Sequence, residues 1–282
     1  MNFPICRTVL LGVLLLPVVQ LSGQTTRTLV GHTAAVNCAI YTADQRYIVT
    51  AAADQVIKIW DAKTGKEVST LVGHTGPVLS LANSPDGSVI ISGAADNSIR
   101  MWDVPRKDPT RIFAAAGLGA RGIAVSRNGQ WAVSFAAKGG QIWNLRSGKS
   151  LFALKGQPAV NAVATRPDNN QIASGDARGE IRLWSPFDGK SRGVIGGHEG
   201  RVSGLVFHPN SQRLVSTGAS GQLKVWQLPL PAERGFSGHT VPVRAVTLTS
   251  NGQLAVTGSD DGVRIVNVAN GQIVRKLDNA AV

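Results

Sequence analysis

Apolar and polar residues alternate with a period of two along most of the chain, as in Val36-Asn37-Cys38-Ala39-Ile40 and Ile99-Arg100-Met101-Trp102. This alternation places successive side chains on opposite faces of a strand. Clusters of Gly, Pro, Asn and Asp separate the apolar runs about every eight to twelve residues, which is typical of short strands joined by turns. No convincing amphipathic helix follows residue 24, so the pattern predicts an all-β chain.

Three sequence markers recur with a period of about 41 residues. Trp residues recur with spacings of 42, 41, 41 and 42, and Val266 follows 40 residues later: Trp60, Trp102, Trp143, Trp184 and Trp226. Gly-His pairs keep the same period: Gly31-His32, Gly73-His74, Gly197-His198 and Gly238-His239. So do the turns Ser84-Pro85-Asp86-Gly87, Ser126-Arg127-Asn128-Gly129 and Arg166-Pro167-Asp168-Asn169. A repeat of this length indicates stacked or circularly arranged units.

Each unit supplies four short strands, and one four-stranded antiparallel sheet per repeat is the blade of a β-propeller. The chain resembles the Trp-Asp (WD) repeat family, whose dipeptide is present as Trp60-Asp61 and Trp102-Asp103. The resemblance covers about residues 25–278 and implies a WD-repeat β-propeller with four-stranded antiparallel blades. Six units are recognisable within a domain spanning 24–282: about 27–66, 67–109, 110–149, 150–190, 191–232 and 233–278.

One position in the first strand of every unit is occupied by a small residue: Cys38, Ser80, Gly122, Ala162, Gly204 and Ala245. The innermost strands of a propeller crowd around its axis, so this position supports a radial arrangement. It also gives Cys38 a packing role.

The family resemblance implies a buried hydrogen-bonded tetrad in each blade, made of His, Ser or Thr, Asp and Trp. Units one and two are complete, unit five has Ser220 in place of Asp, and unit six has Val266 in place of Trp. The residues concerned are His32, Thr50, Asp54 and Trp60; His74, Ser92, Asp96 and Trp102; His198, Ser216 and Trp226; and His239, Thr257 and Asp261. Because the set recurs at a fixed phase, it favours a structural role over a catalytic one.

Units three and four depart furthest from the tetrad pattern. Unit three has Ala115-Ala116 in place of Gly-His, with Ser134 and Lys138 at the Ser and Asp positions. Unit four keeps Ser174 and Trp184 but has Gln157 in place of His and Arg178 in place of Asp.

Basic residues exceed acidic ones, 29 to 17, which gives a formal net charge of +12 and favours anionic partners. Five basic residues are predicted to lie on one face near blades three to five, with two of them directed toward the central channel, Arg121 and Arg244. The full set is Arg121, Lys138, Arg178, Arg201 and Arg244. Arg suits bidentate contacts to carboxylate or phosphate, so we expect an acidic partner there. The alternative is that these are solvated rim charges.

No sequence motif predicts a cofactor, a metal site or a nucleic-acid surface. Gly117-Leu118-Gly119-Ala120-Arg121-Gly122 matches a dinucleotide fingerprint by letter, but a strand follows it instead of a helix. The five His residues show no metal-ligand spacing. The basic residues two positions before each Trp position are distributed over the blades: Lys58, Arg100, Arg182, Lys224 and Arg264.

Residues 1–23 resemble a signal peptide, with Arg7 near the start, an apolar stretch from Val9 to Val19 and small residues at Ser22-Gly23. We expect cleavage near Gln24 and a periplasmic or extracellular protein without stable membrane insertion. A retained membrane anchor is the alternative. Cleavage removes Cys6 and leaves Cys38 without a disulfide partner in the chain.

The chain contains one more candidate outer strand than six blades require, because both Arg27–Val30 and Ile273–Leu277 qualify. Either six blades close with one strand redundant, or a seventh unit of a longer array is absent. The predicted function is an exported, non-enzymatic scaffold that binds other proteins. The alternatives are the repeat portion of a larger exported protein with catalysis elsewhere, or an enzyme with a central site near Arg121, Asn161 and Arg244.

Overall fold

The computed structural model describes residues 27–103, 109–114, 119–136, 139–157, 159–228 and 232–277. Within these ranges the chain is all-β and contains no helix. Consequently, no helix in the described ranges is long and apolar enough to cross a membrane.

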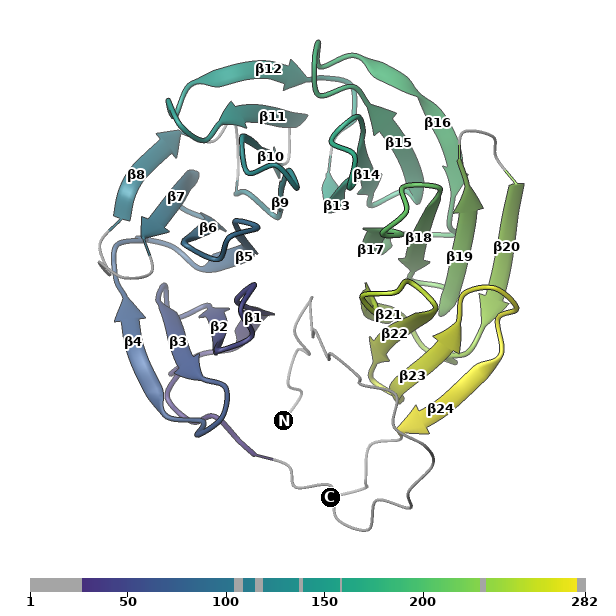
Figure 1. Cartoon of the computed structure of the whole chain (residues 1–282), viewed down its shortest axis with the longest axis horizontal. Helices are drawn as coiled ribbons and strands as arrows, with labels where there is room; N and C mark the ends of the chain where they lie inside the picture. The colour runs from purple at the N-terminus through teal and green to yellow at the C-terminus, as the bar shows by residue number, and fades with distance from the viewer. Residues whose placement is uncertain are drawn as a thin grey trace.

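The strands form six four-stranded sheets, and these are the blades of a six-bladed β-propeller (Figure 1). Blades one to three contain β1 (Val36–Tyr41), β2 (Tyr47–Ala52), β3 (Ile57–Asp61), β4 (Glu67–Leu71); β5 (Val78–Asn83), β6 (Val89–Ala94), β7 (Ser98–Asp103), β8 (Pro109–Ala114); and β9 (Gly122–Val125), β10 (Trp131–Ala136), β11 (Gly139–Asn144), β12 (Ser150–Leu154). Blades four to six contain β13 (Val160–Thr165), β14 (Ile172–Asp176), β15 (Glu180–Trp184), β16 (Ser191–Gly197); β17 (Val202–Phe207), β18 (Arg213–Gly218), β19 (Gln222–Gln227), β20 (Ala232–Ser237); and β21 (Val243–Leu248), β22 (Leu254–Ser259), β23 (Gly262–Asn267), β24 (Ile273–Leu277).

Each blade is an antiparallel meander in which consecutive strands are neighbours. The first strand of each blade lies nearest the central axis and the fourth lies at the rim (Figure 1). The blades are offset from the sequence units, because each unit after the first begins with the strand that forms the rim of the preceding blade, such as Glu67–Leu71 in the unit 67–109. Because the strands of a blade run in alternating directions, one face of the ring carries three segments of every blade. These are the start of the first strand, the turn between the second and third strands, and the end of the fourth strand.

The hydrophobic core lies between blades. Among the described residues, buried apolar side chains form five clusters, and each cluster joins two consecutive blades. In the first cluster Val49 and Ile57 of blade one contact the side of blade two that carries Val78 and Trp102. A strand alternates its side chains between two faces, so every interior blade contributes to the cluster on each side.

Glycines allow the closest approaches between neighbouring blades. A Cβ atom on Gly175 of β14 would lie 2.4 Å from Cγ1 of Val202 in β17. A Cβ atom on Gly204 would lie 2.7 Å from Cγ1 of Val246 in the next blade. Gly204, one of the small residues predicted for the innermost strands, therefore faces the inner strand of the following blade.

The ring is interrupted between blade six and blade one (Figure 1). No apolar cluster of the described residues joins these two blades. β24 is the outer strand of blade six, whereas Arg27–Val30 joins no sheet. Six blades thus form with one outer-strand segment left over.

The tight junction between Gly175 and Val202 predicts that substituting Gly175 destabilises the protein more than substituting Gly258, the glycine at the same position of blade six. We expect Gly175→Ala to lower the free energy of unfolding by about 1–3 kcal/mol, because the added methyl group overpacks the contact with Val202. Gly258→Ala in blade six is the matched control, since a Cβ there meets no atom of the described residues within 4 Å. Urea unfolding measures both variants, and equal losses would contradict packing of Gly175 against the next blade.

Candidate functional site

Buried hydrogen bonds join the His, hydroxyl, Asp and Trp residues of blade two. The His74 ring contacts Asp96 through Nδ1 at 2.8 Å and Ser92 Oγ through Nε2 at 2.7 Å. The Trp102 Nε1–H donates to the same Ser92 oxygen at 2.8 Å. The Thr75 amide donates to Asp96, which fixes the loop after His74. Blade one repeats this arrangement with His32, Thr50, Asp54 and Trp60.

The environment of the tetrad lowers the pKa of both Asp96 and His74. Burial alone would raise the pKa of Asp96, but hydrogen bonds from the Thr75 amide, the His74 ring and Ser98 outweigh it and lower the pKa to about 2. Burial lowers the pKa of His74 despite the neighbouring carboxylate. The two side chains are 6% and 1% exposed, so the tetrad offers no access to a substrate.

Blade five lacks one member of the tetrad. His198 Nε2 lies 2.7 Å from Ser216 Oγ, and Trp226 donates to the same oxygen. Ser220 replaces the Asp, and buried His198 Nδ1 has no hydrogen-bond partner among the described residues. Burial, together with the positive charge of Lys224, lowers the pKa of His198 to about 4.

Blade six keeps the His and Asp but replaces Trp by Val266. His239 lies between Thr257 and Asp261. A small hollow lined by Thr257, Val266 and Ile273 is present near the Trp position. The change removes one donor to the threonine hydroxyl.

Blades three and four retain parts of the pattern. In blade four, Gln157 replaces His: its side-chain oxygen accepts from Ser174, and its amide donates to the Glu180 carbonyl at 3.1 Å. Trp184 donates to Ser174 at 2.6 Å. In blade three, Trp143 donates to Ser134 at 2.9 Å, while Ala115-Ala116 lies outside the described residues.

Two of the predicted basic residues lie on loops that touch. An ideal Cβ on Gly179, next to Arg178, would lie 2.6 Å from the carbonyl oxygen of Gly200, next to Arg201. The Arg178 side chain is 70% exposed and pairs with Asp176 at 3.5 Å. Lys138 lies outside the described residues.

The two arginines predicted to face the channel differ. Arg121 lines the central cavity, whereas Arg244 is absent from its lining. Arg244 donates two hydrogen bonds to Asp260 on the turn between β22 and β23, which raises the pKa of Arg244. The ion pair joins β21 to the turn between β22 and β23 of the same blade. The two residues are 16 positions apart, so the sequence pattern did not predict their contact.

Asp176 was missed by the sequence analysis. Its side chain is fully buried, and its Oδ1 accepts from the amides of Arg178 and Glu180. The sequence did contain a signal for this residue. Asp176 stands two positions after Ser174, where blades one and two have Ala52 and Ala94.

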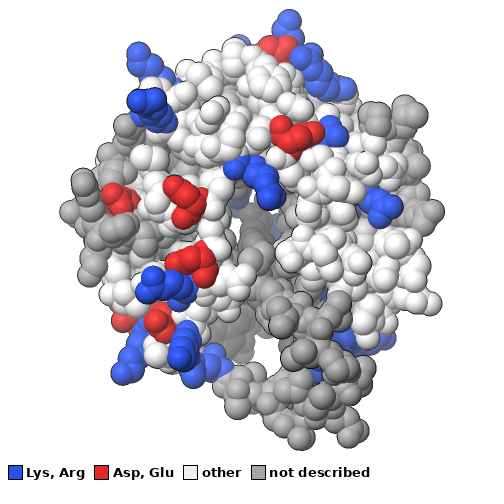
Figure 2. Space-filling model, viewed as in Figure 1, with Lys and Arg blue, Asp and Glu red and all other residues white. Residues whose placement is uncertain are grey.

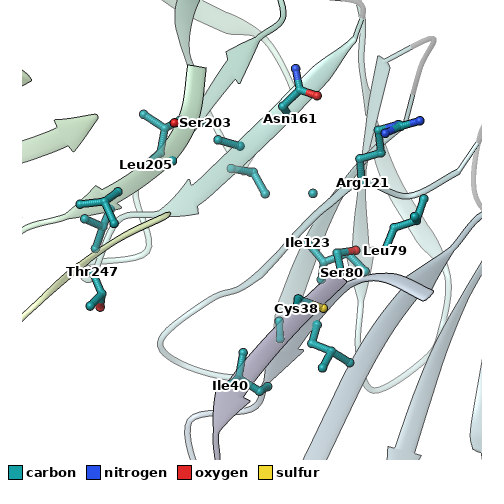
Figure 3. A pocket seen from close by; sticks show the side chains of 18 of the residues that line it. Cys38, Ile40, Leu79, Ser80, Arg121, Ile123, Asn161, Ser203, Leu205 and Thr247 are labelled. Carbon is teal, nitrogen blue, oxygen red and sulfur yellow. The ribbon is translucent and has the colours of Figure 1, made fainter. Parts of the chain in front are cut away.

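The central cavity has a volume of about 280 Å³ and is lined by the innermost strands. Arg121 and Asn161 lie at one end, and Ile40 and Thr247 lie toward the other (Figure 3). Its described lining contains apolar, hydroxyl and amide side chains with Arg121, but no His, Asp or Glu. These residues provide no acid–base pair, and no described group of three His, Cys, Asp or Glu residues has the arrangement of a metal site.

Charges are dispersed over the face shown in Figure 2. Basic side chains lie singly or in small groups, and acidic side chains lie between several of them. One basic group lies at the mouth of the central channel. On this face the described basic side chains are therefore spread around the ring instead of forming one continuous patch.

A second cavity, of about 460 Å³, lies between blades three and four on turns of the opposite face from Arg178. It is lined by Leu151, Phe152 and Phe187 with several amide side chains, and Phe187 is 66% exposed. The sequence signal for this cavity was Phe187 in the turn between β15 and β16, because blade one has Lys63 at the same position.

The family model described as "WD domain, G-beta repeat" matches residues 23–61, 65–103, 148–185, 189–227 and 232–267. The matches leave residues 104–147 uncovered, a segment that contains β9, β10 and β11 of blade three. This is the segment in which the Gly-His pair is replaced.

Several known proteins resemble about a third to a half of the chain. Rat apoptotic protease-activating factor 1 is 29% identical over 48% of this chain, and human angio-associated migratory cell protein is 28% identical over 48%. DDB1- and CUL4-associated factor 13 from Dictyostelium discoideum is 35% identical over 32%. The aligned parts represent 11%, 31% and 19% of those proteins, so the chain spans only a minor part of each.

The complete tetrad of blade two predicts a measurable loss of stability. We expect Asp96→Ala to lower the free energy of unfolding by about 1–3 kcal/mol, because it leaves the Thr75 amide and His74 Nδ1 without their shared acceptor. Asp44→Ala, at an exposed turn, is the control. Chemical denaturation distinguishes the two, and equal small effects would contradict the structural role of Asp96.

The incomplete tetrad of blade five predicts that Ser220→Asp stabilises the protein by about 1 kcal/mol at pH 7.5, because the new carboxylate accepts from His198 Nδ1. The pKa of His198 should rise from about 4. Because the pKa of His198 is lower in the folded protein than in the unfolded chain, where it is about 6.5, the folded wild type loses stability as the pH falls from about 6.5 toward 4. A raised pKa in the variant should make this loss of stability smaller. Urea unfolding at several pH values and NMR titration of His198 measure this, with Ser220→Ala as control; identical behaviour of the two variants would refute it.

Proposed function

This chain belongs to the WD-repeat family, and we propose that it is an exported, non-enzymatic β-propeller scaffold that binds an acidic protein on the face carrying Arg121, Arg178 and Arg201. WD-repeat propellers generally act through protein–protein interaction, and the stacked blades provide a rigid support for surface loops. Binding of other proteins is consistent with the matched repeats, whereas the acidic character of the partner is inferred from charge.

The observation that carries the acidic-partner proposal is the contact between the loops of Arg178 and Arg201, with Arg121 at the channel mouth one blade away. Arg178 remains largely exposed beyond its pairing with Asp176, and Arg121 is also exposed. Three guanidinium groups on neighbouring blades can contact several carboxylates of one partner. The planar donors of Arg suit this recognition better than the point charge of Lys.

Two further features support the non-enzymatic, exported assignment. The recurring His, Ser and Asp residues are engaged in structural hydrogen bonds, as in blade two. The apolar leader at residues 1–23 supports export and lies outside the described residues. Because the chain matches only a minor part of its relatives, a role as the repeat portion of a larger exported protein is the second candidate.

The basic face predicts that the double reversal Arg178→Glu with Arg201→Glu reduces capture of the partner at least about tenfold, since attraction becomes repulsion. The immobilised exported protein is exposed to an envelope extract at about 0.1 M and 0.5 M salt, and retained proteins are quantified by mass spectrometry. Wild-type capture should fall at high salt because screening shortens the range of the attraction.

The matched control is Arg127→Glu with Lys190→Glu, which changes the net charge equally on the opposite face of the ring. This control should retain the partner of the wild type. If both double variants lose it equally, net charge and not the basic face is responsible. If neither loses it, these arginines are solvated rim charges.

A further inference from the structure

The cavity between blades three and four differs in chemistry from the corresponding cavity one junction earlier. Between blades two and three, a cavity of about 360 Å³ on the same face is lined by the charged residues Asp86, Arg127 and Arg146. The turn position of Arg146 is occupied by Phe187 in blade four. The described lining of the cavity between blades three and four contains no Lys, Arg or His, and Asp168 is its one charged residue. This junction therefore presents a nearly neutral surface in a chain of net charge +12.

Large apolar side chains in this cavity are accessible from outside. Phe187 is 66% exposed, and Leu151 of β12 is 44% exposed. Phe152 and Trp131 add aromatic rings to the lining. An exposed aromatic ring at the edge of a cavity can stack against the apolar face of a bound molecule.

The turn that carries Phe187 is fixed by its own hydrogen bonds and by contact with blade three. The Phe187 amide donates to Ser185 Oγ at 3.3 Å, and the Gly189 amide donates to the Ser185 carbonyl at 3.1 Å. Pro186 is buried and has a restricted backbone angle. A Cβ on Gly189 would lie 2.7 Å from Phe152, so the turn packs against β12 of the preceding blade (Figure 1). The Phe187 ring is therefore presented to solvent by a turn that is itself held in place.

Side-chain amides of two neighbouring turns line another part of the cavity. The Asn128 backbone amide donates to Asn169 Oδ1 at 3.1 Å, which joins blade three to blade four. Asn128 Nδ2 donates to Gln130 Oε1 at 3.3 Å. Among the described residues, the side-chain NH₂ groups of Gln130 and Asn169 and the whole side-chain amide of Asn170 have no hydrogen-bond partner. These groups can donate to and accept from a bound molecule.

The backbone amides of these turns are already used within the protein. The Gln130 amide donates to Asn128 Oδ1, and the Asn170 amide donates to Asp168 Oδ1. The Asp168 carboxylate also pairs with Arg166 at 3.3 Å. The described lining therefore offers no row of free backbone groups to an extended peptide, no positive charge to an anion, and only one, already paired, carboxylate to a cation. Its accessible groups suit a neutral molecule with hydroxyl groups around an apolar face.

We propose that this cavity, on the face opposite Arg178, is a binding site for a neutral carbohydrate. A pyranose ring has an apolar C–H face, which stacks on Phe187. Its hydroxyl groups exchange hydrogen bonds with the side-chain amides of Gln130, Asn169 and Asn170. The volume of about 460 Å³ lies within the range of about 300–1,000 Å³ that is usual for small-molecule sites. The site shares no residue with the basic face and does not depend on the proposed acidic partner.

The test uses the full chain and three neutral oligosaccharides that differ in linkage and substituents: maltohexaose, cellohexaose and chitohexaose. Each is titrated to about 10 mM, and binding is followed by NMR. We expect at least one of them to bind, and Phe187→Ala to weaken its binding at least about tenfold, because the stacking surface is lost. Asn170→Ala should weaken the same binding about threefold or more, since its amide no longer exchanges hydrogen bonds with the sugar.

Two further variants serve as controls. Phe187→Tyr keeps an aromatic ring and should retain binding. Val194→Ala on β16 is the matched loss of exposed apolar surface, because Val194 is 51% exposed and does not line the cavity. Phe187 and Asn170 are themselves exposed, so circular dichroism should show that every variant is folded.

Saccharide binding that is weakened by Phe187→Ala and by Asn170→Ala, but retained by Phe187→Tyr and Val194→Ala, supports the proposal. Binding that Phe187→Ala leaves unchanged would place the saccharide elsewhere and overturn this site, and failure of all three probes to bind would overturn it as well. Hexagalacturonate is the charged comparison, and its tighter, Phe187-dependent binding would contradict a neutral ligand. Phe187-dependent capture of peptides from a random library, without saccharide binding, would assign the cavity to a polypeptide and overturn the proposal.

Discussion

The constraint on which this structure depends is that a four-stranded blade has two apolar faces and can bury neither alone. Each described apolar cluster combines side chains from two consecutive blades, so stability arises at junctions instead of inside single sheets. The close approach of Gly175 to Val202 shows how tightly one junction is fitted. An array with this construction has an uncovered face wherever it ends, unless its two ends meet.

The tetrads solve a second problem, which is to hold the loops between blades. His74 links the loop before blade two to strand β6 through Ser92 and to the turn between β6 and β7 through Asp96, and the Thr75 amide also donates to Asp96. Blade five has kept the buried His198 without the carboxylate, so its ring is held through one nitrogen only. The loop that carries Arg201 is the loop after His198, so this part of the basic face is supported by a tetrad that lacks its carboxylate.

Features that repeat could be predicted from the sequence, and features that occur once could not. The alternation within strands, the small inner residues and the tetrad positions recur in several units, so each copy supported the others. The Arg244–Asp260 pair, buried Asp176 and exposed Phe187 each occur in a single blade and depend on which turns meet in space. Arg27–Val30 was predicted as a candidate outer strand, but in the structure it joins no sheet, and its contact with the turn at Gly65 could not be predicted from the sequence.

The basic face is distributed over three blades, because Arg121, Arg178 and Arg201 come from blades three, four and five. A partner that contacts all three arginines therefore bridges two blade junctions. Its binding free energy adds to the stability of the folded ring by linkage, because the three guanidinium groups are brought together only when those blades are packed.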